Sequence, residues 1–142
     1  MRYLFDTCVV SELISRNPND TVLRWVSQQN EKHVYLSVVT IGEIQHGIEK
    51  LADGKRKESL TKWLEEDLMT RFNGKILDID VNVMMQWGRI VAGLERIGKP
   101  MPVMDSIIAA VAIEHDLHLV TRNVKDFENL DLRIVNPWVS DG

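Results

Sequence analysis

The 142-residue sequence has a single cysteine, Cys8, and little that points toward a membrane or an oxidising environment. One thiol excludes a framework of disulfides and a cysteine-rich zinc site, and it is typical of a protein from a reducing compartment. No uncharged run reaches the roughly 18 residues that a membrane-spanning helix needs, and no signal-peptide core follows the first residues. These absences predict a cytoplasmic protein without a membrane segment.

Positive charge is also in short supply. Seventeen Lys and Arg residues stand against twenty-one Asp and Glu residues, which gives a formal net charge of -4 at pH 7. This balance argues against a protein that binds nucleic acid through bulk positive charge. With 44% apolar residues, the chain is long enough to bury one hydrophobic core and too short for two ordinary domains.

Short apolar segments alternate with longer segments of helical periodicity. The apolar segments predict strands at Tyr3–Phe5, Val34–Leu36, Ile76–Ile79, His118–Thr121 and Arg133–Val135. The periodic segments predict helices near residues 9–14, 23–26, 40–51, 56–72, 81–97, 102–115 and 124–129. This alternation predicts an α/β fold, a three-layer sandwich with a mainly parallel central sheet flanked by helices. Ligands of such sheets bind beyond the carboxyl ends of the strands.

Four acidic residues are expected at that edge of the sheet. Asp6 directly follows the first strand, and Glu43 lies near the start of the helix after the second. Asp105 occupies the first turn of an otherwise apolar helix, and Asp126 follows the strand that ends at Thr121. Carboxylates that cluster take up protons unless a cation neutralises them, and ligand sets made only of oxygen suit Mg²⁺ or Mn²⁺.

Each acid also has a simpler interpretation. Asp6 can cap a helix, and Thr40-x-x-Glu43 matches a capping box, a pair of side chains that satisfies the first turn of a helix. The helix dipole favours Asp105 near a helix start, and an acid such as Asp126 in a short surface helix is usually solvated. If all four are caps or surface charges, the chain is a non-catalytic protein-binding module. A third possibility is a Mg²⁺-dependent phosphotransfer domain. Haloacid-dehalogenase phosphatases, however, need a second Asp two positions after the first, where this chain has Cys8.

The order of the acidic motifs resembles a known family. Asp6-Thr7, Glu43 in "TIGEIQHGIEKL", Asp105 in "MDSIIAAVA" and the segment "LVTRNVKDF" are similar to the PIN-domain ribonucleases, specifically the VapC and FitB type toxins of bacterial toxin–antitoxin pairs. The resemblance extends to the "NPW" segment at Asn136 to Trp138 and implies one PIN domain over residues 1–142.

This resemblance implies a Mg²⁺- or Mn²⁺-dependent endoribonuclease with Asp6, Glu43 and Asp105 as metal-binding acids. It implies hydrolysis of RNA phosphodiesters by metal-activated water, with transfer RNA or another structured cellular RNA as substrate. Many relatives carry Asp where this chain has Asn123, so Asp126 is a candidate for the fourth acidic place. The resemblance also implies a homodimer and an inhibitory VapB- or FitA-like antitoxin. In such a complex the antitoxin binds DNA, and the toxin is associated with DNA only indirectly.

Other polar residues near the acids complete the predicted site. Those expected to support the acidic side chains are Thr7, Ser106, Thr121 and Asn123, and those expected to position RNA are Arg122 and Lys125. Cys8 stands where the family often has Asn, which removes one polar contact near Asp6 but no metal ligand.

Overall fold

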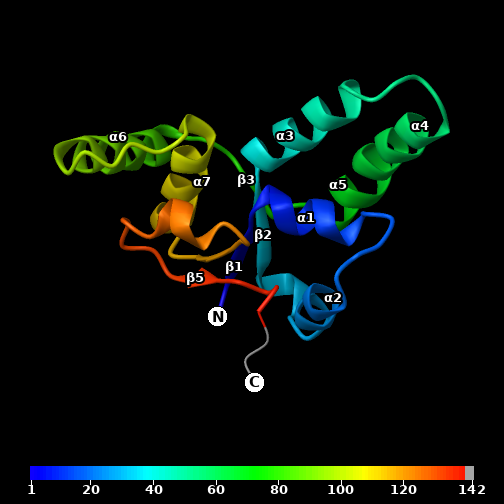
Figure 1. Ribbon diagram of the computed structural model, residues 1–142, viewed down its shortest axis with the longest axis horizontal. Coiled ribbons are helices and arrows are strands. Elements are labelled where there is room, and N and C mark those ends of the chain that lie inside the picture. Colours follow the sequence, from blue (N-terminus) through cyan, green and yellow to red (C-terminus); the bar gives the residue numbers. More distant parts are fainter. Residues whose placement is uncertain (140–142) are drawn as a thin grey trace.

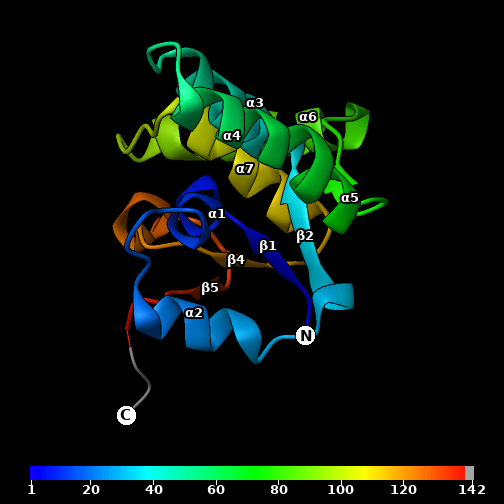
Figure 2. The same cartoon turned by 90° about the vertical axis from the view of Figure 1, so that its right-hand side faces the viewer.

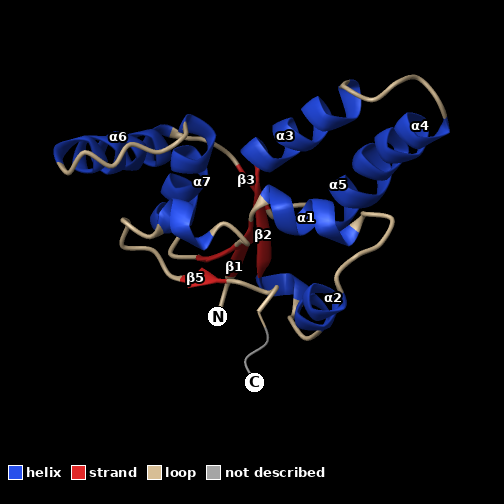
Figure 3. Ribbon diagram, in the orientation of Figure 1, coloured by secondary structure: helices blue, strands red, loops and turns tan. Residues whose placement is uncertain are grey.

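Five short strands form a fully parallel sheet in the order β3-β2-β1-β4-β5. The strands lie at the centre of the molecule, red among the blue helices in Figure 3. The computed structural model describes residues 1–139, so the predicted domain end at residue 142 lies outside the described residues. The strands are β1 (Tyr3–Phe5), β2 (Val34–Ser37), β3 (Ile76–Leu77), β4 (His118–Val120) and β5 (Ile134–Val135). All five predicted strands are confirmed, but β3 ends two residues before the predicted limit at Ile79. Ile79 is 38% exposed and adjoins Asp80, which caps the next helix.

Helices make up most of the rest of the chain. They are α1 (Thr7–Leu13), α2 (Asp20–Ser27), α3 (Val38–Glu49), α4 (Lys55–Lys62), α5 (Met69–Arg71), α6 (Val81–Arg96) and α7 (Val103–Glu114). A π-helical segment, η2 (Trp63–Leu68), connects α4 to α5, so the single helix predicted over residues 56–72 contains a change of helical pitch. Short 3₁₀ helices are η1 (Glu31–His33) and η3 (Val124–Phe127), and η3 stands where a helix over 124–129 was predicted. Within residues 1–139, none of the helices has the length and apolar character of a membrane span.

The helices cover both faces of the sheet (Figure 1). Because successive side chains of a strand point to opposite faces, Leu4 packs into the core beneath α6 and α7, while Phe5 packs into the core beneath α1, α3 and α4. Leu119 and Val120 of β4 divide in the same way. The predicted three-layer sandwich is therefore confirmed.

The strand order reverses at β1. From β1 the chain builds β2 and β3 outward on one side, and it later places β4 and β5 on the other side. The carboxyl ends of β1 and β4 therefore flank a topological switch point, where α/β sheets bind ligands. Helices α1 and α3 begin directly after β1 and β2, and α7, which precedes β4, begins at the same edge. The order of the strands thus brings four distant segments together.

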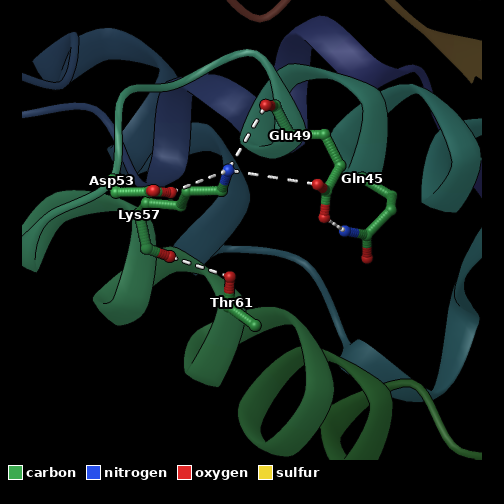
Figure 4. A network of polar contacts seen from close by, with 5 residues as sticks. All are labelled: Gln45, Glu49, Asp53, Lys57 and Thr61. Carbon is green, nitrogen blue, oxygen red and sulfur yellow. Dashed lines mark hydrogen bonds and ion pairs between the residues drawn. The ribbon is translucent and has the colours of Figure 1, made fainter.

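Helices α3 and α4 form a hairpin beside this edge (Figure 2). Its main polar link is Lys57, whose Nζ lies 3.5 Å from Asp53 Oδ1, 4.0 Å from Glu49 Oε2 and 3.4 Å from the Glu49 carbonyl oxygen (Figure 4). The amide of Gln45 donates to Glu49 Oε1 at 2.9 Å, and the Thr61 hydroxyl donates to the Lys57 carbonyl at 2.8 Å. The contacts of the partly shielded Lys57 ammonium connect the end of α3 with α4, while the bonds of Gln45 and Thr61 lie within α3 and within α4.

Candidate active site

Asp6 is the most buried acid of the site, at 4% exposure. It follows β1 directly, and its carboxylate accepts hydrogen bonds from the Thr7 backbone N–H (Oδ1, 2.8 Å) and from the Thr121 hydroxyl (Oδ2, 2.8 Å). The Thr7 bond confirms that Asp6 caps α1, while the second oxygen is bound by Thr121, the residue directly after β4. Burial raises the pKa of Asp6 above its usual range, the hydrogen bonds from Thr121 and Thr7 oppose this shift, and the charge of Glu43 adds to it.

Glu43 lies in the second turn of α3, and its capping-box interpretation is wrong. The residue that caps α3 is Ser37, whose hydroxyl accepts a hydrogen bond from the Thr40 backbone N–H at 3.4 Å. Glu43 is instead bound from α1, because the Thr7 hydroxyl donates to Glu43 Oε1 at 2.6 Å. The fully buried Thr40 hydroxyl lies 3.0 Å from the same Thr7 oxygen. Two threonines therefore orient Glu43 toward the site.

Thr40 is a functional candidate that the sequence analysis missed. It was interpreted only as part of a cap, although it is a polar residue within the apolar run Val38–Ile41 and lies on the inner face of α3. A buried hydroxyl needs a partner, and an acidic residue three positions later was the available signal.

Asp105 shows that the acids gather at one place. It lies in the first turn of α7 and is half-buried. Burial together with the charges of Asp6, Asp126 and Glu43 raises the pKa of Asp105 to about 6. None of the ion pairs within residues 1–139 involves any of these four acids. The edge of the sheet therefore carries a cluster of carboxylates without a cationic partner in the described chain.

The remaining predicted residues differ in how they meet this cluster. Asn123 and Asp126 are exposed in and before η3, and the Asn123 backbone N–H donates to Thr121 Oγ1 at 3.1 Å. Ser106 is placed differently: its hydroxyl accepts from Trp87 Nε1 at 2.8 Å and donates to the Val103 carbonyl at 2.6 Å, so it joins α7 to α6. Thr121 thus contacts Asp6 directly and Asn123 contacts Thr121 only through its backbone N–H, while the hydroxyl of Ser106 is engaged in helix packing.

Three further side chains, one thiol and two basic groups, were expected near the cluster. Cys8 Sγ lies 3.9 Å from Asp6 Oδ2 and 3.5 Å from Thr121 Oγ1, and burial raises the pKa of this thiol, which favours its neutral form. The Arg122 guanidinium lies over the ring of Trp138, 5.5 Å from its centroid. Both basic residues predicted to position RNA, Arg122 and Lys125, are exposed.

The donor set suits a hard divalent cation. All four acids offer oxygen ligands, and Asn123 adds a carbonyl oxygen; Mg²⁺ and Mn²⁺ favour such ligands. Among residues 1–139, however, no three Asp, Glu, His or Cys side chains stand close enough together to hold an ion. The carboxylates surround the edge of the sheet without closing on one point, as mutually repelling charges do.

Comparison with known proteins identifies the fold family. A profile of the PIN domain matches residues 3–132. Toxin FitB of Neisseria gonorrhoeae is 35% identical over 135 residues, which cover 95% of this chain and 97% of FitB. VapC ribonuclease Y4jK of Sinorhizobium fredii is 32% identical over 135 residues, which cover 95% and 96% of the two chains. A solved structure of FitAB bound to an IR36 DNA fragment matches with a TM-score of 0.94 and 32% identity, over 99% of this chain and 98% of that chain. The chain therefore belongs to the PIN domain family, in the group that contains FitB and VapC.

Proposed function

We propose that this chain, as one PIN domain over residues 1–142, is the toxin of a toxin–antitoxin pair and a Mg²⁺- or Mn²⁺-dependent endoribonuclease. The observation that carries the proposal is the convergence of Asp6, Glu43, Asp105 and Asp126, from four separate segments, at the switch point of the sheet. The relatives named toxin FitB and VapC ribonuclease Y4jK support this assignment. A cluster of bare carboxylates repels the phosphates of RNA, so RNA binding at this edge requires a cation.

Asp6, Glu43 and Asp105 would hold the metal, with Asp126 or Asn123 at the fourth place. A bound Mg²⁺ or Mn²⁺ supplies Lewis acidity that activates water and offsets charge on the leaving oxygen of a phosphodiester. The chain contributes orientation: Thr121 and the Thr7 backbone fix the Asp6 carboxylate, and the Thr7 hydroxyl fixes Glu43. Lys125 and Arg122 would position RNA beside the acids. Hydrolysis of this kind leaves 5′-phosphate and 3′-hydroxyl ends.

The partners follow from the same assignment. We propose a cognate VapB- or FitA-like antitoxin that inhibits the enzyme and connects it to DNA, a homodimeric toxin, and transfer RNA or another structured cellular RNA as the cytoplasmic substrate. A structure of the relative FitAB bound to DNA supports the antitoxin and its DNA contact. An antitoxin arginine facing the acids is chemically suitable, because a guanidinium binds carboxylates in a bidentate geometry.

The test compares RNA cleavage by the purified chain and its Asp105→Asn variant in Mg²⁺, in Mn²⁺ and with a chelator. The matched control is Asp131→Asn, which removes an exposed acid that lines a separate pocket with Asp116 and Leu117 of the α7–β4 connection. We expect cleavage only with a divalent cation, 5′-phosphate product ends, and loss of activity in Asp105→Asn alone. If Asp105→Asn cleaves as fast as the parent, the metal assignment is wrong. Mapping the new 5′ ends in cellular RNA after brief induction identifies the substrate.

A further inference from the structure

A pocket of about 170 Å³ opens directly beside the acidic site, between the α6–α7 connection and η3. Its lining includes Lys99, Met101, Lys125, Asp126, Asn129 and Leu130. Asp126 also contributes to the electrostatic environment of Asp105, so the pocket and the acidic cluster share a wall. A ligand that reaches from one to the other crosses Asp126.

The pocket has a cationic rim on a protein of net negative charge. Lys99 and Lys125 are exposed, and no ion pair within residues 1–139 uses either of them. Their ammonium groups therefore remain available to an anion. Lysines placed in this way next to clustered carboxylates favour a ligand with several phosphates, one at the acidic site and another at the rim.

The floor of the pocket is apolar. Leu94 is 4% exposed, and Met101 and Leu130 pack against the core beneath α6 and α7. The amide of Asn129 adds a polar group to the wall. An inorganic anion would gain nothing from contact with this apolar floor, and a purely apolar ligand would form no ion pair with the two lysines. A nucleotide has both parts, and unpaired RNA bases are recognised by apolar and stacking contacts together with side-chain amides.

We propose that this pocket receives the RNA nucleotide that flanks the scissile phosphate, with Lys99 and Lys125 on its phosphate and the Met101–Leu130 floor beneath its base. This inference rests on the proposed ribonuclease function and extends it to the substrate at the cut, which is an unpaired nucleotide of a loop or a single strand. Duplex RNA cannot place a base there without unpairing it.

The test measures binding of a short single-stranded RNA pool of random sequence to the protein with its four acids intact, in Ca²⁺ in place of Mg²⁺ so that the RNA is held without being cut, across a range of salt concentrations. Two changes are added separately: Lys99→Ala with Lys125→Ala, and Asn129→Ile, which narrows the pocket without altering charge or adding an aromatic ring. The control pair is Arg24→Ala with Lys32→Ala, which removes two exposed positive charges at the amino end of the sheet. Circular dichroism and thermal melting establish that every variant is folded.

We expect the lysine pair to weaken binding several-fold and to lower the salt slope by about 1.4, at about 0.7 for each phosphate contact with single-stranded RNA. We expect Asn129→Ile to weaken binding with the slope unchanged, and the control pair to bind as its parent does. Normal binding by either pocket variant, or an equal loss in the control pair, overturns the proposal. Cleavage by the otherwise native chain is measured in parallel. Its absence rejects the ribonuclease function itself, whereas normal cleavage with unaffected binding rejects only the pocket.

Discussion

The two halves of the acidic site are built differently. In the bonded half, Asp6 and Glu43 accept hydrogen bonds from the backbone N–H and the hydroxyl of Thr7 in α1 and from the hydroxyl of Thr121, the residue directly after β4. In the open half, Asp105 and Asp126 receive no side-chain hydrogen bond within residues 1–139, and Asp126 is exposed on η3. The open half is therefore positioned only by its backbone.

The difference indicates how the site assembles. Hydrogen bonds from the fold fix the bonded half in advance, and preorganised ligands of this kind need no rearrangement when a cation arrives. In the open half, burial and, after it, the charges of Asp6, Asp126 and Glu43 raise the pKa of Asp105 to about 6. A divalent cation would lower this repulsion and draw the open carboxylates inward. Substitutions in the bonded half should therefore lower both fold stability and metal binding, whereas substitutions in the open half should lower metal binding alone.

The largest expected effect comes from exchanging one acid in each half for alanine. Asp6→Ala and Asp105→Ala should each lower RNA cleavage by about a thousandfold, since a catalytic metal supplies several kcal/mol of transition-state stabilisation. Their stabilities should move in opposite directions. Asp6→Ala leaves the buried Thr121 hydroxyl without its acceptor and removes the cap of α1, at a cost of about 1–3 kcal/mol.

Asp105→Ala removes a charge that the metal-free fold does not favour, so near neutral pH the variant should melt at or above the parent's temperature. Both quantities are measured on the same preparations, by cleavage assay and by urea denaturation without metal. Equal destabilisation of the two variants would contradict the division into a bonded and an open half.

A second prediction concerns pH. Because the folded chain raises the pKa of Asp105 from 3.8 to about 6, the folded state binds more protons than the unfolded state between these values. The contribution of Asp105 to the free energy of unfolding of the metal-free protein is therefore most favourable below about pH 4. It declines as pH rises through about 6, by on the order of 1–2 kcal/mol after allowance for solvent screening. Asp105→Asn should flatten this part of the profile.

The same protonation opposes metal binding. Mn²⁺ should raise the melting temperature strongly at about pH 8 and weakly at about pH 5, because the metal must displace the proton from Asp105. Melting curves with and without Mn²⁺ at both values provide the measurement, and Asp131→Asn serves as the control. Equal stabilisation at the two values would show that Asp105 does not bind the ion.

Much of this site could be predicted from the sequence, because strand ends are visible as patterns. Tyr3–Phe5 followed at once by Asp6, and an acid in the first turn of an apolar helix, place two carboxylates at one edge of a parallel sheet. The cap of α1 by Asp6 could be predicted, but the tertiary hydrogen bonds could not, since they join α1 to α3 and the end of β1 to the residue after β4, across 33 and 115 positions of sequence. Ser106 illustrates the same limit: its position beside Asp105 suggested support for the acid, but the tertiary partner is Trp87.

The fold was predicted to a similar depth. The alternation of segments identified every strand, whereas the end of β3 depends on where its neighbour β2 stops pairing, at Ser37 with Leu77. The π-helical segment η2 leaves no pattern in sequence, because its apolar residues Leu64 and Leu68 keep the ordinary spacing of four. Packing against the sheet decides such details.

A third prediction tests the bonded half from a distance. Thr40→Val keeps the size of the side chain and removes the hydroxyl that meets Thr7, so Glu43 loses part of its orientation. We expect cleavage to fall about tenfold in kcat with little change in KM, since RNA does not contact this buried residue. Thr40→Ser should restore most of the activity. Thr61→Val, which removes a hydroxyl bound to the Lys57 carbonyl, is the matched control. An equal loss of activity in this control would contradict the orientation of Glu43 by Thr40 through Thr7.

The smallest expected effect concerns the fourth acidic place in the open half. Asn123→Asp adds a carboxylate beside Thr121, and Asp126→Asn removes one charge that acts on Asp105. Since both positions are exposed, each change should alter Mn²⁺ affinity only several-fold, upward for Asn123→Asp and downward for Asp126→Asn. Isothermal titration measures both, with Asn73→Asp as a control for net charge. If Asn123→Asp tightens binding while Asp126→Asn leaves it unchanged, the fourth place belongs to position 123, and Asp126 serves the neighbouring pocket rather than the metal.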